Sequence, residues 1–161
     1  MERIDYINYA RALQLGRKFE ESQRVVEAGL AKEPLNGTLN RFALMNNNDM
    51  KKFPEAIKYA EVLFTKVDKD SVKLKDIDYQ NYGNALAGNN QFEEAIAKFN
   101  EALALPAEDN TLHADLYKSI SDAYKGMKDY PKAIDSYKQF LEANTGADAT
   151  DWAGLGILQI A

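Results

Sequence analysis

The 161-residue sequence has no cysteine, one histidine, one tryptophan and four prolines. Without cysteine the chain cannot form a disulfide, a thiolate metal site or a cysteine nucleophile, and a single histidine excludes metal sites that need two imidazoles. No apolar run approaches the roughly 20 residues that a membrane-spanning helix requires. Acidic residues outnumber basic ones by 25 to 20. The sequence therefore lacks the dense positive charge of surfaces that bind nucleic acid or anionic membranes.

Short motifs for catalysis or cofactor binding are also missing. There is no Gly-x-Ser-x-Gly nucleophile elbow, no Gly-x4-Gly-Lys-Ser/Thr phosphate loop and no Gly-x-Gly-x2-Gly fingerprint. Residues 68–71 resemble the start of a calcium loop, but the sixth position is not glycine and Tyr79 replaces the bidentate glutamate. His113 lies in a polar segment that we interpret as a solvated loop. We predict no enzyme activity, no cofactor and no metal site.

Large apolar side chains are abundant, because 45% of the residues are hydrophobic and seven Phe and nine Tyr are present. This composition excludes a disordered chain. The length suits one domain with a sizeable core.

Two short patterns recur four times along the chain. In the first, an aromatic residue is followed three positions later by a small residue, namely Ser22, Ala56, Ala95 and Ala133. In the second, which precedes each of these, three large residues flank a small one, namely Ala10, Ala43, Gly83 and Ser121. Large residues three and four positions apart share one face of a helix. Each repeat therefore predicts two amphipathic helices.

Turn-forming residues separate the two helices of each predicted pair. We place these turns at residues 16–18, 47–49, 88–90 and 126–128, where Gly and Asn gather. Pro54 and Pro131 fall at the expected start of a second helix, where a missing N–H costs little. Glu20, Glu21, Glu93 and Glu94 fall in the first turns of second helices, where the helix dipole favours them.

Together these positions resemble the tetratricopeptide repeat. The match is strongest in the third repeat, through Tyr79, Tyr82, Gly83, Leu86, Ala95, Phe99 and Ala102. The resemblance implies an all-α, right-handed superhelical solenoid of antiparallel helix pairs. We predict a single repeat domain over residues 1–161, with units at about 3–36, 37–75, 76–113 and 114–148. The aromatic residues at repeat positions, such as Tyr82, Phe99 and Tyr137, are interpreted as core.

Residues 149–161 restart the pattern and are almost wholly apolar. We interpret them as a partial fifth unit or a capping helix. Trp152, Leu155 and Leu158 should then form an end-stacking interface that seeks an apolar partner within the chain or in another molecule. Because a solenoid normally ends with a polar outer face, this favours a fragment of a longer repeat protein. The alternative is a natural end that docks on a second copy.

The resemblance also implies that the first helix of each pair lines a concave, peptide-binding groove. Projected onto this sequence, that rule selects four residues from each first helix, most of them polar: Ile7, Asn8, Arg11, Gln14, Asn40, Arg41, Leu44, Asn47, Gln80, Asn81, Asn84, Ala87, Lys118, Ser119, Asp122 and Lys125. Carboxamides both donate and accept hydrogen bonds, so they can hold the backbone of an extended peptide. The alternative is that these amides only keep the surface soluble.

The sequence thus favours a non-catalytic scaffold that binds a protein or an extended peptide in this groove, with Arg11, Arg41 and Lys118 orienting an acidic partner. Two alternatives stay open. One is an assembly or oligomerisation module that acts through the apolar segment 149–161, and the other is a regulatory repeat domain of a larger enzyme. The partner and the compartment, cytoplasmic or periplasmic, are not indicated.

Overall fold

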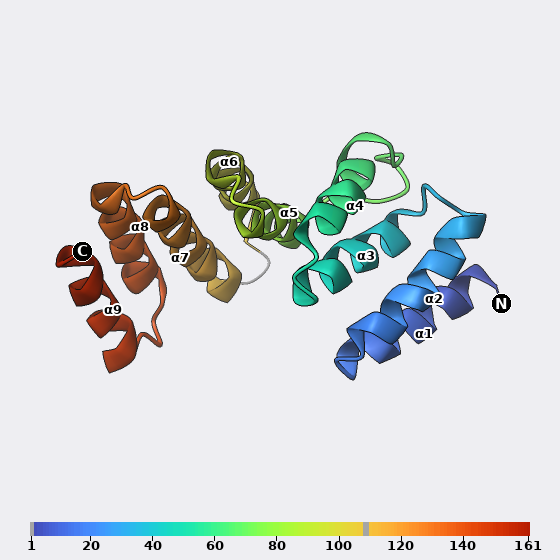
Figure 1. Cartoon of the computed structure of the whole chain (residues 1–161), viewed down its shortest axis with the longest axis horizontal. Coiled ribbons are helices and arrows are strands. Elements are labelled where there is room, and N and C mark those ends of the chain that lie inside the picture. The colour runs from blue at the N-terminus through green and yellow to red at the C-terminus, as the bar shows by residue number, and fades with distance from the viewer. Residues whose placement is uncertain (1, 108–109) are drawn as a thin grey trace. The chain divides into compact units, whose positions relative to one another are not determined.

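The computed structural model describes residues 2–107 and 110–161, and every helix or strand assigned there is an α-helix, as the sequence predicts. The chain divides into two compact units, Met1–Leu74 and Lys75–Ala161 (Figure 1). The first unit contains α1 (Arg3–Leu15), α2 (Phe19–Lys32), α3 (Gly37–Asp49) and α4 (Phe53–Thr65). The second contains α5 (Asp76–Gly88), α6 (Phe92–Leu103), α7 (Asn110–Gly126), α8 (Tyr130–Ala143) and α9 (Ala149–Gln159). None of these helices is long and apolar enough to cross a membrane.

Four helix pairs form the units: α1 with α2, α3 with α4, α5 with α6, and α7 with α8. Each pair is joined by a turn of the same geometry. One residue in each turn has a positive φ: Arg17, Lys51, Asn90 and Lys128, with φ of 57°, 58°, 61° and 62°. The next residue donates its N–H to the carbonyl five positions back, as Lys18 does to Leu13 at 2.9 Å. This is the Schellman ending, which satisfies carbonyls that a helix terminus leaves unpaired.

The turn of the second pair lies later than the sequence predicts. We expected it at residues 47–49, but α3 continues to Asp49, and the residue with positive φ is Lys51. Asn47 lies within the helix, and its side-chain amide donates to the carbonyl of Ala43, one turn earlier, at 2.8 Å. Asparagine at the end of a helix therefore does not by itself mark the turn.

The second helices begin where the sequence places them. Pro54 and Pro131 lie in the first turns of α4 and α8. Glu20 and Glu21 occupy the first turn of α2, and Glu93 and Glu94 that of α6. These positions suit the missing N–H of proline and the positive end of the helix dipole. The local chemistry of each start thus agrees with the repeat pattern.

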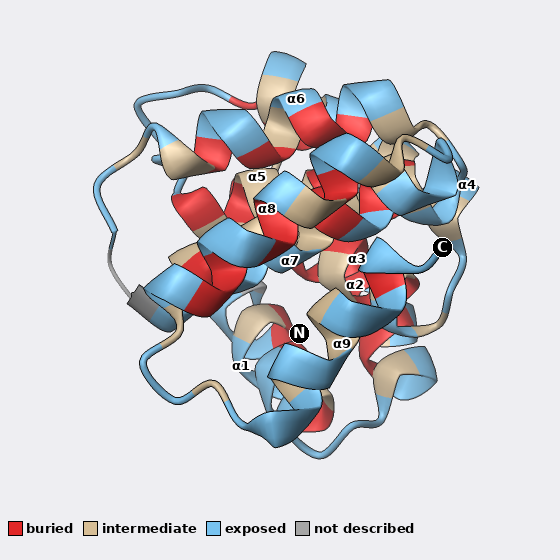
Figure 2. Ribbon diagram, turned by 90° about the vertical axis from the view of Figure 1, so that its left-hand side faces the viewer, coloured by how far each residue is buried: buried red, intermediate tan, exposed pale blue. Residues whose placement is uncertain are grey.

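Small residues from the two helices of each pair are buried in the structure. They are Ala10 and Ser22, Ala43 and Ala56, Gly83 and Ala95, and Ser121 and Ala133. In two pairs a hydroxyl connects them: Ser22 Oγ donates to the carbonyl of Ala10 at 2.9 Å, and Ser121 Oγ donates to that of Ala133 at 2.7 Å. Figure 2 shows such buried positions alternating with exposed ones along the helices. The backbones approach closely because nothing larger stands between them.

A buried chain of polar groups connects three helices of the first unit. Gln14 Nε2 on α1 donates to Asn46 Oδ1 on α3, and Asn46 Nδ2 donates to Ser22 Oγ on α2, each at 3.0 Å. Asn46 and Ser22 are completely buried. An apolar cluster that includes Tyr6, Val26 and Phe42 packs in the same unit. The polar chain satisfies groups that would be costly to bury unpaired.

The second unit has a core of the kind expected from the repeat aromatics. Phe99 and Tyr137 are buried, whereas Tyr82 is only half-buried. Tyr137 packs edge-on against Phe140, with ring centroids 5.3 Å apart, in a cluster that also includes Leu141. Two of the three aromatic residues singled out in the sequence therefore lie in the core, and the third lies at its margin.

The expected position of His113 is wrong. It is not in a solvated loop but on α7, where it is partly buried and its Nε2 lies 3.6 Å from Oδ2 of the buried Asp76 on α5. The helix includes this segment because Leu112 and Leu116, four positions apart, share one face, and Leu116 and Ala114 are both buried. Polar neighbours hid that pattern in the sequence.

Enlarging a small residue within a helix pair should destabilise its unit. Ala95 on α6 is fully buried, so we expect Ala95→Leu to lower the free energy of unfolding by about 1–3 kcal/mol through overpacking. Ala97, two positions along the same helix, is exposed, and Ala97→Leu should change it by less than about 0.5 kcal/mol. Urea unfolding followed by circular dichroism measures both, and equal stability of the two variants would contradict this packing.

Candidate functional site

Three polar residues from two first helices line one cavity of the second unit. Asn84 lies on α5, and Ser119 and Asp122 lie on α7. The cavity has a volume of about 270 Å³, and its other walls are Ala87, Phe92, Phe99 and Ala123. In the part of the chain that the structure describes, the Asn84 amide and the Ser119 hydroxyl form no hydrogen bond. These groups are therefore available to a ligand.

The packing of α5 on α6 positions Asn84. Its neighbour Gly83 is buried, and a Cβ there would lie 2.6 Å from Cδ1 of Phe99, so only glycine allows this contact. Asn84 is the next residue along α5 and is half-buried. On α7, Ser119 and Asp122 are three positions apart and so share one face. The cavity thus depends on the same close packing that forms the core.

One carboxylate lines this cavity. Among the described residues of its lining, Asp122 alone is charged, and it pairs with Lys125 at 3.4 Å on the exposed surface of α7. Outside this lining, burial and then the carboxylates of Asp151, Asp122 and Asp148 raise the pKa of Tyr137. In the cavity itself, a ligand would meet the acceptors of Asn84 and Ser119 and a carboxylate that Lys125 already pairs.

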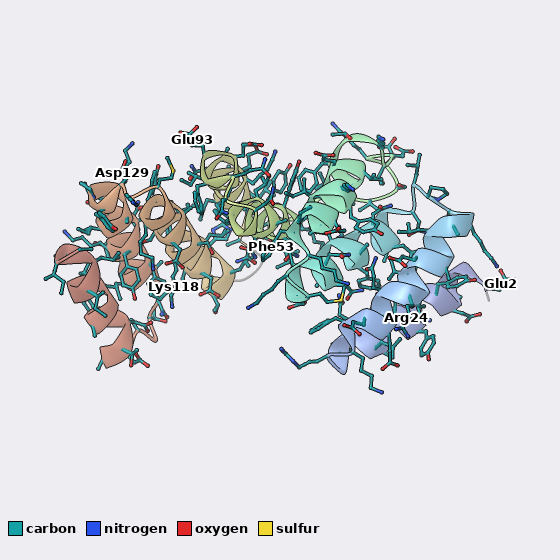
Figure 3. The ribbon with its side chains drawn as sticks, in the orientation of Figure 1. Glu2, Arg24, Phe53, Glu93, Lys118 and Asp129 are labelled. Carbon is teal, nitrogen blue, oxygen red and sulfur yellow. The ribbon has the colours of Figure 1, made fainter. Side chains whose placement is uncertain are left out.

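Lys118, the cation predicted for this surface, interacts with residues outside the cavity. Lys118 on α7 (labelled in Figure 3) places its ammonium 5.1 Å from the ring centroid of Phe140 and 4.0 Å from Oδ1 of Asp151. It does not line the α5–α7 cavity. Gln80 and Asn81 are half-buried on α5 and also lie outside the cavity lining. Half of the groove residues predicted on α5 and α7 therefore line the cavity, namely Asn84, Ala87, Ser119 and Asp122.

Three predicted residues of the first unit remain at its surface. Asn8 and Arg11 are exposed on α1, and the Arg11 guanidinium lies 5.9 Å from the ring centroid of Phe42. Arg41 on α3 is half-buried, and its Nη2 donates to the carbonyl of Lys73 at 3.2 Å. The two arginines thus also hold parts of the unit together, Arg11 across α1 and α3 and Arg41 between α3 and the segment after α4.

Asn40 and Asn47 do not belong to the exposed surface, which corrects the expectation for these two residues. Asn40 is 2% exposed, and its Nδ2 donates to the carbonyls of Pro34 and Asn36 at 3.0 and 2.9 Å. Asn47 is 3% exposed and bonded to Ala43. Both amides fix the fold locally. A sequence pattern selects the helix and its approximate face but cannot tell whether an amide binds backbone or solvent.

The predicted end-stacking residues of α9 differ in exposure. Leu158 is buried in a cluster with Tyr137 and Phe140, and Leu155 packs partly against it. Three other apolar residues are exposed: Trp152 (57%), Ile157 (66%) and Ile160 (85%). One side of α9 therefore finds its apolar partner within the unit, while the other side remains uncovered.

Several solved structures have the same arrangement of helices as this chain. MamA matches 97% of this chain and 80% of its own at 19% identity, with a TM-score of 0.77. YrrB, described as a TPR protein with an unusual peptide-binding site, matches 99% and 77% at 16% identity, with a TM-score of 0.75. PilF of Pseudomonas aeruginosa matches 95% and 67% at 16% identity, with a TM-score of 0.70. The chain has the tetratricopeptide repeat fold. No protein-family profile and no curated protein matches the sequence.

The tetratricopeptide repeat fold predicted from the sequence is thus confirmed, whereas the site residues stay predictions apart from the two corrections. The sequence analysis missed Phe92, which walls the α5–α7 cavity but was interpreted only as the aromatic mark of its repeat. In the described residues, no group of three or more histidine or carboxylate side chains is placed to hold a metal ion.

Two glycines of α9 should respond oppositely to alanine. A Cβ at Gly154 would overlap the Tyr137 hydroxyl, which donates to the carbonyl of Asp151 at 2.9 Å. We expect Gly154→Ala to destabilise the chain by about 1–3 kcal/mol. At Gly156 a Cβ meets nothing within 4 Å, so Gly156→Ala should stabilise α9 by about 0.5–1 kcal/mol. Thermal unfolding checks both signs, and equal shifts would contradict the described packing of α9.

Proposed function

We propose that this chain is a non-catalytic scaffold that binds a protein segment or extended peptide on the first helices of its repeats. The observation that carries the proposal is the α5–α7 cavity, where Asn84 and Asp122, both selected from the sequence, line the same space as Ser119. The peptide-binding site named for YrrB supports it, because that protein has the same fold.

The binding mode follows from the chemistry of these side chains. A carboxamide donates and accepts, so Asn84 can satisfy both the N–H and the C=O of one peptide unit. Asp122 and Ser119 lie across the cavity on α7 and offer acceptors to a second N–H or to a cationic side chain. Because hydrogen bonds to backbone are independent of side-chain identity, this mode suits an extended segment. The phenyl rings of Phe92 and Phe99 provide an apolar wall for a small side chain.

Removing these polar groups should weaken peptide binding without unfolding the chain. Peptides selected from a displayed random library on the complete chain serve as ligands, and calorimetry gives Kd. We expect the double variant Asn84→Ala, Asp122→Asn to weaken binding by roughly tenfold or more, because each lost hydrogen bond to a charged or amide group costs about 0.5–3 kcal/mol. Asn100→Ala, at an exposed position of α6, is the matched control and should bind as the native chain does. Equal affinity in all three proteins would reject this site.

A second function, assembly through α9, is favoured by one specific observation. Trp152 and Ile157 on this short helix, and Ile160 directly after it, are exposed large apolar residues. Gly156 occupies the repeat position that is small and buried in all four helix pairs, yet on α9 it contacts nothing within 4 Å. The uncovered side could therefore receive another helix.

A charged residue introduced on the exposed side of α9 should abolish any association through this helix. If α9 joins copies of the chain, sedimentation equilibrium will show an oligomer that Ile157→Glu converts to monomer. Exposed Glu142→Gln on α8 is the control and should leave the oligomer intact. A native chain that is monomeric at every concentration tested would contradict assembly through α9, and peptide binding at Asn84 is measured independently of this result.

A further inference from the structure

A second cavity lies in the first unit, mainly on the second helices of the repeats. It has a volume of about 550 Å³ and is lined by α2 and α4 together with Pro34 and with Asn40 of α3. Its apolar lining is Leu30, Ala31, Pro34 and Val62. Cavities of this size that combine apolar walls with convergent polar groups are typical of ligand sites. The polar groups that line this cavity indicate the chemical class of ligand that it can bind.

Two carboxylates face it from opposite helices, Glu27 on α2 and Glu55 on α4. Tyr59 also lines the cavity and lies close enough to both carboxylates to be affected by their charge. Burial raises the pKa of the Tyr59 hydroxyl, and the negative charges of Glu27 and Glu55 raise that pKa further. Among the residues that the structure describes, no lysine or arginine pairs with either carboxylate. Lys58 lies on the same rim without reaching them. The cavity thus combines apolar side chains with two carboxylates and a single lysine, which leaves an excess of one negative charge in its lining.

A buried amide behind the cavity holds two of its lining residues in place. Gln23 is only 7% exposed, and its Nε2 donates to Oε1 of Glu27 at 3.0 Å and to the Tyr59 hydroxyl at 3.2 Å. Gln23 does not itself line the cavity. Because both bonds come from one buried group, the Glu27 carboxylate and the Tyr59 hydroxyl are fixed relative to each other, and the Gln23 amide responds to changes at either.

We propose that the α2–α4 cavity binds an arginine side chain presented by an exposed segment of a partner protein. The methylene stem packs on Leu30 and Val62, and the guanidinium lies between Glu27 and Glu55. Arginine fits better than lysine because its planar fork of five donors can bond two carboxylates at once, and because it is weakly hydrated. This surface is distinct from the α5–α7 cavity and recognises a side chain rather than peptide backbone.

A capped peptide, acetyl-Gly-Leu-Arg-Leu-Gly-amide, tests the proposal against the complete chain. The matched probe replaces arginine with citrulline, which has nearly the same shape but no charge. Binding is followed by the NMR signals of the Gln23 side-chain amide and the Tyr59 ring. We expect the arginine peptide to shift these signals with an affinity that falls as salt rises, and the citrulline peptide to bind at least about tenfold more weakly.

Charge variants locate the site. Glu27→Gln and Glu55→Gln should each weaken the arginine peptide by roughly tenfold, whereas Lys58→Gln should tighten it about two- to threefold by removing a like charge. Glu20→Gln, also exposed on α2 but outside the cavity, is the control and should have no effect. A thermal melt confirms that each variant is folded.

The proposal is overturned if the two peptides bind equally, if neither moves the Gln23 and Tyr59 signals at millimolar concentration, or if Glu20→Gln weakens binding as much as Glu27→Gln. The Asn84→Ala, Asp122→Asn variant should bind the arginine peptide normally. Failure of this site and failure of the α5–α7 site are therefore separate results.

Discussion

Close approach between two helix backbones is the constraint on which each repeat depends. Ala10 with Ser22, and Gly83 with Ala95, place little side-chain volume between the helices, so the large residues on either side can interlock. The turn serves the same end. A Schellman ending with one left-handed residue reverses the chain within three residues, and it does so four times with nearly the same φ. Surface residues can vary widely while these positions stay small.

The positions of the polar residues at the two cavities depend on this helix packing. Asn84 adjoins Gly83, whose lack of a side chain admits the Phe99 ring, and that ring then walls the cavity that Asn84 lines. On the second helices, Gln23 adjoins the completely buried Ser22 and holds Glu27 and Tyr59 at the rim of the α2–α4 cavity. In both units a polar residue next to a small buried one is fixed in position by the core, which lowers the entropy lost when it binds a ligand.

Much of the fold could be predicted because the repeat pattern is local and recurs. Helix starts at Pro54 and Pro131 and the burial of Phe99 and Tyr137 follow from residue type and spacing alone. The site was less predictable. Asn40 and Asn47 have the same side chain as Asn84, but theirs bond to nearby carbonyls. Lys118 is on the expected helix, but Phe140 and Asp151 attract its ammonium. The partner of each such side chain depends on residues that are distant in sequence and become neighbours only in the fold. The spacing of residues along the chain therefore does not reveal these partners.

The two serines among the small residues reveal a local pseudo-twofold symmetry. Ser22 is on a second helix and bonds to Ala10 on the first, whereas Ser121 is on a first helix and bonds to Ala133 on the second. An antiparallel pair has an approximate dyad through its crossing, so either helix can carry the hydroxyl and reach the same kind of carbonyl. In the first unit that freedom is lost, because Asn46 of α3 donates to Ser22 Oγ. The neighbouring repeat breaks the dyad there and dictates which helix carries the serine.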